Sequence, residues 1–332
     1  MPRQPKATTL AIALAIAVVA LQALLVPLFA GPAANLGPRD LPLAVAGPAP
    51  AAQQLAARLE TERPGAFDVR VVTDADAAIR EREVYGAIVL GAQGPSLHIA
   101  SAASPTVATL LTQATAELGQ GQPVPVVDVV PTHPGDPRGA GFGGGFLPLA
   151  MTGLLAGILT FLLVRRRAAR LLALGTFGVL AGFAGAAVLQ FWLDVLPGHY
   201  LANAGAMGLF ALAVAATLTG LGAVLDRAGV ALGAVSVFLI GNALSGISSA
   251  AELLPQPWGA VGQFLPVGAG GTLLRSVAYF DGNGAGRALA VLSAYAIGGL
   301  VLVAAGRRGL SVSTAEVAPA PQEREPEPAV VR

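Results

Sequence analysis

Residues 10–30 read LAIALAIAVVALQALLVPLFA, an apolar run without a charged side chain. A helix needs about 20 largely apolar residues to cross a hydrocarbon core of about 30 Å, so this run predicts a transmembrane helix. A cleaved signal peptide is the alternative, since Arg3 and Lys6 precede the run. The run is longer than the roughly 7–15 apolar residues of a signal peptide, and its exit has no clean small-x-small site. We therefore expect a retained anchor.

Five further runs have the same character: 146–164, 171–193, 201–225, 230–250 and 288–305. Hydrophobic residues make up 54% of the 332 residues and charged residues 12%, against about 25% charged in ordinary globular proteins. Such a chain cannot cover itself with a polar surface. The sequence predicts an α-helical polytopic membrane protein with six transmembrane helices.

Arginine placement predicts the orientation of these helices. The loop 165–170 reads RRRAAR, Arg227 follows the fourth run, and Arg307 and Arg308 follow the sixth. With alternating spans, these residues and the chain start 1–9 fall on one side, which the positive-inside rule makes cytoplasmic. Both termini are then cytoplasmic, and the Pro- and Glu-rich residues 306–332 are expected to be a disordered tail. Lys6 is the only lysine among 20 basic residues, a bias that indicates a GC-rich bacterial genome and hence a bacterial cell membrane.

Residues 31–145 have a different pattern, in which short β-like and helical segments alternate. The segments expected as strands are 41–46, 67–72, 85–90, 97–100 and 124–130, and those expected as helices are 51–60, 74–83 and 105–118. Asp74 is placed as an N-cap, and Pro105 suits a first helical turn. The pattern predicts a small α/β domain, inserted after the first span on the extracytoplasmic side.

Residues 251–287 lie within the five-helix region 146–305 but are broken by proline and glycine. We expect one or two short re-entrant or interfacial helices at the outer membrane surface, with a plain loop as the alternative. On a helix, an apolar face with Arg275 off it would be shared by Leu273, Leu274, Val277 and Phe280.

Several chemistries are excluded or not indicated. The chain has no cysteine, its three histidines are far apart, and its net charge is +1; these facts argue against disulfides, a Cys-ligated metal and nucleic-acid binding. A Walker A motif needs a lysine after its last glycine, and the only lysine is Lys6. No acid–base pair or nucleophile constellation is visible. We expect no enzymatic activity, no metal and no cofactor in this chain.

Polar side chains within the spans are candidates for a substrate path, namely Gln22, Asn203, Asn242 and Ser245. Interhelical hydrogen bonding is the alternative interpretation. Three Gly-x-x-x-Gly pairs, at 153/157, 178/182 and 229/233, favour closely packed helices.

Two stretches carry a family resemblance. One is DPRGAGF at 136–142, leading to Leu147-Pro148; the other is FLPVG at 264–268, followed by LRSVAYFD at 274–281. Together with the six spans and the α/β insert, they resemble permeases of the type-2 ABC exporter family, in the subgroup with a large outside domain (YhgE/phage-infection-like membrane proteins). The resemblance covers nearly the whole chain.

The resemblance implies that two permease units form the pathway as a homo- or heterodimer. It also implies that a separate ATP-binding cassette subunit, which binds ATP and Mg²⁺, docks on cytoplasmic elements. On this chain the docking loop corresponds to Arg165, Arg166, Arg167 and Arg170.

The sequence-based hypothesis is therefore an export permease for an unidentified, amphiphilic substrate. The alternative is a non-transporting membrane scaffold or receptor, whose extracytoplasmic domain binds an envelope partner. The short cytoplasmic segments favour this alternative, because they offer an ATPase only a small docking surface.

Overall fold

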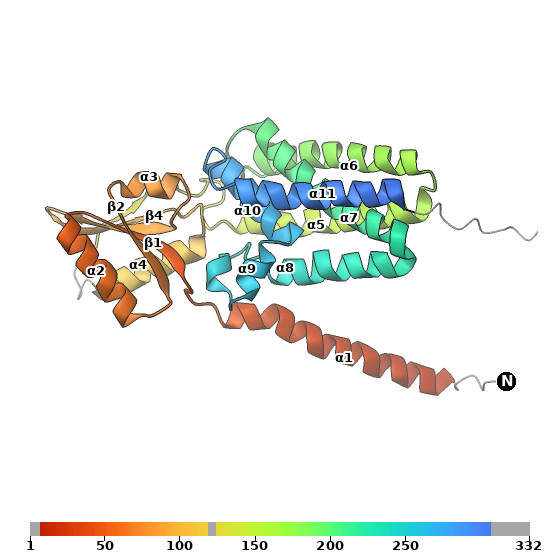
Figure 1. Cartoon of the computed structure of the whole chain (residues 1–332), viewed down its shortest axis with the longest axis horizontal. Coiled ribbons are helices and arrows are strands. Elements are labelled where there is room, and N and C mark those ends of the chain that lie inside the picture. The colour runs from red at the N-terminus through yellow and green to blue at the C-terminus, as the bar shows by residue number, and fades with distance from the viewer. Residues whose placement is uncertain (1–6, 119–123, 307–332) are drawn as a thin grey trace, which may run out of the picture.

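The computed structural model describes residues 7–118 and 124–306. A sheet domain sits at one end of a bundle of long helices, and helix α1 (Ala7–Ala34) runs beside the bundle and diverges from it (Figure 1). The tail predicted at 306–332, with Arg307 and Arg308, and the positions Arg3 and Lys6 lie almost wholly outside the described residues.

The sheet domain has five strands, in the order β2-β1-β3-β4-β5. They are β1 (Leu41–Ala46), β2 (Phe67–Val72), β3 (Gly86–Gly91), β4 (Gly94–Ile99) and β5 (Val126–Asp128). All pairs are parallel except β3 with β4. The bounds of β1 and β2 are those expected from the sequence, and the other three strands lie within a few residues of the prediction.

Helices cover both faces of the sheet. They are α2 (Ala49–Glu62), α3 (Ala75–Arg80) and α4 (Pro105–Leu118). Leu59 of α2 and Leu111 of α4 share one core with Leu43, whereas α3 packs its buried Ile79 on the opposite face. Asp74 caps α3 as predicted, accepting a hydrogen bond of 2.9 Å from the backbone amide of Ala77.

The two cores of the sheet domain include residues from the bundle side. Ala250 and Leu253 belong to the core under α2 and α4. Phe280, which follows helix α10 (Pro266–Tyr279), belongs to the core under α3. Residues of the segment 250–280 thus pack on both faces of the sheet domain, although the sequence pattern places this segment outside the domain.

Within residues 7–118 and 124–306, five helices are long and apolar enough to cross a membrane. They are α1, α5 (Ala140–Leu163), α6 (Arg167–Ala187) with its π-helical extension η1 (Val188–Trp192), α7 (Tyr200–Gly233) with its continuations η2 (Ala234–Ile240) and α8 (Gly241–Ala243), and α11 (Gly286–Ala305). This confirms a helical membrane protein, with five such helices where the sequence predicts six spans.

The difference lies in α7, because the runs 201–225 and 230–250 are two helices that a tight reversal joins into the single element Tyr200–Ala243. Asp226 interrupts it, with φ 54° and ψ −141°. A Cβ added to Gly222 would lie 2.8 Å from the side chain of Val230, and one added to Gly233 would lie 3.2 Å from that of Leu218. The two halves therefore fold back on each other at Asp226.

Replacing Asp226 with Gly should stabilise the protein by about 1 kcal/mol, because this backbone conformation strains any residue with a Cβ. In a chain of this size such a gain raises the apparent Tm by roughly 2–4 °C, measured by thermal unfolding in detergent. Asp226→Val should lower it, since a β-branched residue tolerates positive φ least. Equal Tm values for both variants would contradict the strained turn.

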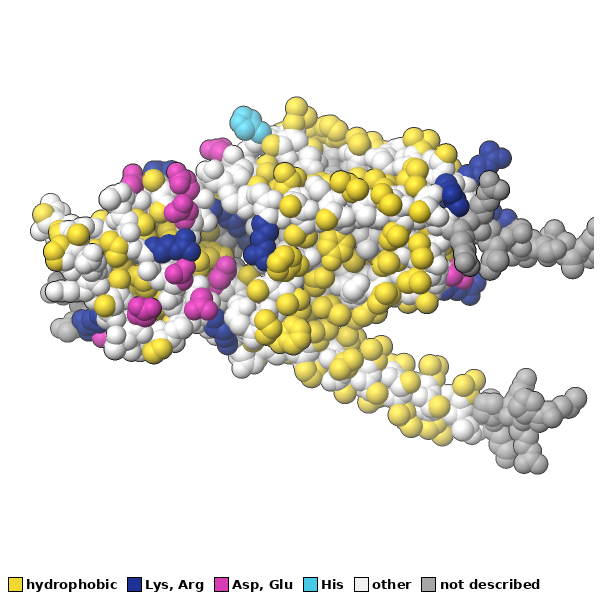
Figure 2. All heavy atoms as spheres, viewed as in Figure 1, with side chains coloured by type: hydrophobic (Ala, Val, Ile, Leu, Met, Phe, Trp, Pro, Cys, Tyr) yellow, Lys and Arg dark blue, Asp and Glu magenta, His cyan; other side chains and the backbone are white. Residues whose placement is uncertain are grey.

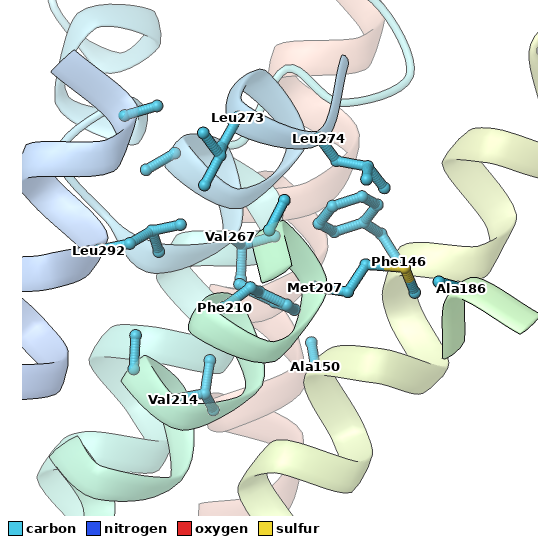
Figure 3. Packing of buried hydrophobic residues seen from close by; sticks show 14 of the residues in the cluster. Phe146, Ala150, Ala186, Met207, Phe210, Val214, Val267, Leu273, Leu274 and Leu292 are labelled. Atoms are coloured by element: carbon cyan, nitrogen blue, oxygen red, sulfur yellow. The ribbon is translucent and has the colours of Figure 1, made fainter. Parts of the chain in front are cut away.

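The bundle core forms around α7. Phe146 of α5 packs on Phe210 of α7, with 5.3 Å between ring centroids. Val267 and Leu274 of α10 and Leu292 of α11 complete this cluster (Figure 3). The glycine pairs predicted to allow close packing lie at helix contacts of this kind, since a Cβ on Gly157 would lie 2.9 Å from Leu218 Cβ.

Residues 251–287 contain short helices, as the sequence predicts, and not the plain loop of the alternative. They form η3 (Ala251–Leu253), α9 (Trp258–Gly262) and α10. Most of α10 is buried, including Leu273, Leu274 and Arg275. Arg275 is buried as well as the apolar face, because α10 inserts between the bundle and the sheet domain and is covered on several sides.

Candidate functional site

A cavity of about 330 Å³ lies where the sheet domain meets the bundle. We call it the junction cavity. Figure 2 shows acidic and basic side chains gathered along this seam, whereas the flank of the bundle is largely apolar. The charged and phenolic residues that line the cavity are Arg82, Glu83, Tyr85, Glu252, Arg275 and Arg287. Three of them come from the sheet domain and three from the chain after α8.

Arg82 reaches from the sheet domain to helix α10. It sits in the turn between α3 and β3 with φ 64°, a left-handed conformation that directs its side chain across the seam. Its Nη1 donates to the carbonyl of Thr272 at 3.0 Å and to the hydroxyl of Ser276. Its guanidinium lies 5.3 Å from the centre of the Phe280 ring. Arg82 therefore ties the two parts of the molecule together and borders the cavity.

Arg275 enters the cavity from α10, on the same turn that Arg82 contacts. Only 8% of Arg275 is exposed. Its guanidinium lies 4.7 Å from the centre of the Phe142 ring, and Nη2 donates to the carbonyl of Ile247 at 3.0 Å. Burial and the nearby charge of Arg82 lower the pKa of Arg275 to about 10, so the guanidinium stays protonated at neutral pH.

The acidic side of the cavity is formed by Glu252, which accepts a hydrogen bond of 2.8 Å from the hydroxyl of Tyr85. Burial and the nearby charge of Glu252 raise the pKa of Tyr85, so the phenol keeps its proton and acts as the donor. At the rim, Arg287 stacks 4.2 Å from the centre of the Phe264 ring. Arg287 belongs to the first turn of α11, which places the rim at the level where that apolar helix begins.

The polar residues predicted for a substrate path do not come together. Gln22 is exposed on α1. Asn203 is fully buried, and its amide donates to the carbonyl of Pro197 at 2.8 Å and to Gln190 at 3.2 Å. Asn242 is half-buried near the end of α8, and Ser245 lines the junction cavity. Of the four, Ser245 alone belongs to the candidate site.

The four arginines predicted to contact an ATPase fall into two groups. Arg165, Arg166 and Arg167 are exposed at the end of the bundle far from the sheet domain, although Arg167 also donates to the carbonyl of Ala304 at 3.0 Å. Arg170 is buried. It donates to the carbonyls of Val164 and Phe161, at 2.6 and 2.9 Å, and so satisfies the open end of α5. Its side chain is not displayed to a partner.

Sequence reasoning misses Arg82 and Arg275 as site residues. Arg82 lies in a run of charged residues that indicates a solvated face, and Arg275 falls at the polar edge of an amphipathic helix. One signal is present. Arg275 follows Leu273-Leu274 and precedes Ser276-Val277-Ala278, so its immediate neighbours include no acidic residue that could pair with it locally.

Comparison with protein-family models, with curated proteins and with solved structures gives no match to this chain. Function is therefore argued from the geometry.

Proposed function

We propose that the chain is the membrane-embedded subunit of an exporter, driven by ATP hydrolysis on a separate protein that docks at the arginine-bearing end of the bundle. Two copies, or one copy and a related subunit, form the pathway. The observation that carries the proposal is the difference between the two ends of the bundle. Its far end displays Arg165, Arg166 and Arg167, and its other end carries the sheet domain (Figures 1 and 2).

The positive-inside rule puts the arginine-bearing end in the cytoplasm and the sheet domain outside. The reversal at Asp226 fits this orientation. A 44-residue element at 1.5 Å per residue is roughly 66 Å long, about twice a hydrocarbon core. Folded at Asp226, it crosses twice, which gives six crossings and puts Arg227 at the same end as the other arginines.

Helix α1 supports a multi-subunit assembly. Its apolar window is 0% buried, and its side chains, such as Leu14 and Leu24, are more than 60% exposed. Lipid or a second subunit must cover this surface. In an exporter built from two units, a helix that stands apart from its own bundle supplies a surface for such a contact.

Changing Arg165, Arg166 and Arg167 together to Gln should abolish co-purification of the ATPase while leaving insertion intact. The reason is that these three arginines are exposed at the end of the bundle, whereas Arg170 is buried. The measurement is a mild-detergent pull-down of the tagged full chain from its native membrane, with mass spectrometry of the co-purified proteins. The unaltered chain should retain a stoichiometric soluble protein with a Walker A motif.

The matched control changes Arg58, Arg63 and Arg70 to Gln, three exposed arginines of the sheet domain, and should leave the complex unchanged. Arg170 is left intact because its loss would expose the end of α5. An ATPase that remains bound to the loop variant would refute the docking surface. Absence of any ATPase from the unaltered complex, in several detergents and in nanodiscs, would refute the exporter.

A receptor or scaffold is the second candidate, and the junction cavity is the observation that favours it. The sheet domain is clamped to the bundle from both faces, and a charged cavity lies between them. A ligand taken up there would be sensed by both parts. A bound ligand with no associated ATPase would favour this candidate.

A further inference from the structure

We propose that the junction cavity binds a phosphate-bearing anion, held by the guanidinium groups of Arg82, Arg275 and Arg287. This inference rests on the cavity and not on the proposed export, and it applies equally to an exporter and to a receptor. The source of the phosphate group is either an anionic phospholipid headgroup or a soluble phosphate ester.

The first argument is charge balance. No ion pair within the described residues involves Arg82, Arg275 or Arg287. Of the two acidic residues at the cavity, Glu83 is exposed, and Glu252 keeps its negative charge while it accepts the hydrogen bond of Tyr85. The charge of Glu252 acts on Arg82, opposing the lowering of its pKa by burial. Three arginines therefore face two carboxylates, and Arg275 is the cation near which no described acidic side chain acts. Arg275 is buried, Arg82 is half-buried and Arg287 is exposed. Because an isolated buried ion loses its hydration without compensation, the need for a partner is greatest at Arg275. A bound anion would supply the missing partner.

The second argument is the number of donors left open. A guanidinium has five N–H donors in a fixed fork. In the described part of the chain, Arg275 uses Nη2 on Ile247 and Arg82 uses Nη1 on Thr272 and Ser276. The other nitrogens of both residues have no protein partner there. Two protonated forks with open donors at one cavity match the oxygens of a phosphate group, which arginine binds bidentately.

The third argument is that the guanidinium groups are held in place before any ligand arrives. Each lies over an aromatic ring: Arg82 over Phe280, Arg275 over Phe142, and Arg287 over Phe264. A cation–π contact favours a position over the ring and uses no hydrogen-bond acceptor. A site with such oriented cations loses less side-chain entropy on binding than exposed lysines would.

Size and location are consistent with a headgroup or a small ester. A volume of about 330 Å³ lies at the lower end of the range for small-molecule sites, about 300–1,000 Å³. Arg287 and Ala288 of the first turn of α11 line the cavity, so it lies beside the start of an apolar helix.

The test uses the delipidated full chain in a phosphate-free, non-ionic detergent, with glycerol 3-phosphate as the soluble probe in calorimetric titration. In a second arm, native mass spectrometry counts phosphatidylglycerol and phosphatidylcholine retained from mixed nanodiscs. In whichever of the two measurements detects binding, Arg275→Gln and Arg287→Gln should each weaken it about 10- to 100-fold, the range for a hydrogen-bonded charge. Arg70→Gln, which removes an exposed arginine of β2, is the matched control and should change it less than about twofold, as expected for a surface site.

Arg287→Gln keeps the test decisive if Arg275→Gln fails to fold, because Arg287 lies at the rim and is not buried in the core. Binding of glycerol 3-phosphate supports a soluble ester, and selective retention of phosphatidylglycerol supports a lipid headgroup. No binding in either arm overturns the proposal, as does equal weakening by Arg70→Gln and Arg287→Gln. Neither result depends on an ATPase, so failure here is distinct from failure of the exporter.

Discussion

Replacing Gly182 with Leu should prevent the bundle from assembling and remove most of the monodisperse protein. A Cβ at Gly182 of α6 would overlap the carbonyl oxygen of Ala204 and lie 2.9 Å from the Cα of Gly208, both on α7. These are backbone atoms, so no rotamer change relieves the clash. Overpacking typically costs about 1–3 kcal/mol and occasionally more, and here two long helices must separate. The measurement is the monodisperse yield in size-exclusion chromatography.

Gly175→Leu is the matched control on the same helix, because a Cβ at Gly175 meets nothing within 4 Å. Its yield should stay within about twofold of the unaltered protein, since single exposed substitutions have small effects. Gly182→Ala should fall between the two variants, because it adds the Cβ without a longer side chain. If Gly182→Leu and Gly175→Leu gave equal yields, the close approach of α6 and α7 would be refuted.

The sheet domain could be predicted from the sequence because its signals are local. The apolar segment LPLAVA becomes β1 with the bounds 41–46, a buried interior strand between β2 and β3. The alternating FDVRVV becomes the edge strand β2. Asp74 caps α3 by accepting a hydrogen bond from the backbone amide of Ala77, three residues further along the chain. In each case the secondary structure is indicated by contacts within the segment or by the spacing of its apolar side chains.

The candidate site could not be predicted because its contacts are not local. Arg82 and Thr272 are 190 residues apart in sequence, and Tyr85 is 167 residues from Glu252. A lone arginine on a short amphipathic helix has the same pattern whether its polar edge faces water or a second domain. Burial of Arg275 depends on the sheet domain docking over α10. The spacing of apolar residues within α10 does not indicate this contact.

The fold-back at Asp226 has a similar cause. The sequence shows the apolar runs on either side of it, and Asp226-Arg227 marks the interruption between them. It does not indicate the tightness of the reversal, which one residue in a positive-φ conformation completes. It also does not indicate the π-helical stretch Ala234–Ile240, after which the second half ends earlier than expected.

Replacing Phe280 with Ala should release the sheet domain from the bundle. Phe280 is 3% exposed, and it packs in the core that α3 and the sheet form. Its ring also stacks with the guanidinium of Arg82. Truncation of a buried Phe costs about 3–5 kcal/mol. Because this ring joins the bundle to the domain, we expect the loss to fall on the seam. Hydrogen exchange measures it as lost protection in residues 82–85 and 276–284.

The core strands β1 and β3 should keep their protection, because the core on the other face of the sheet, around Leu43 and Leu97, does not include Phe280. Phe191→Ala is the control, since Phe191 is 68% exposed and belongs to neither core of the sheet domain. Its exchange at the seam should be unchanged. If the seam stayed protected in Phe280→Ala, docking would rest on the remaining contacts across it, which are the packing of Ala250 and Leu253 and the hydrogen bonds of Arg82 and Tyr85. If β1 and β3 lost protection together with the seam, Phe280 would hold the domain fold itself, and the seam would not open separately from it.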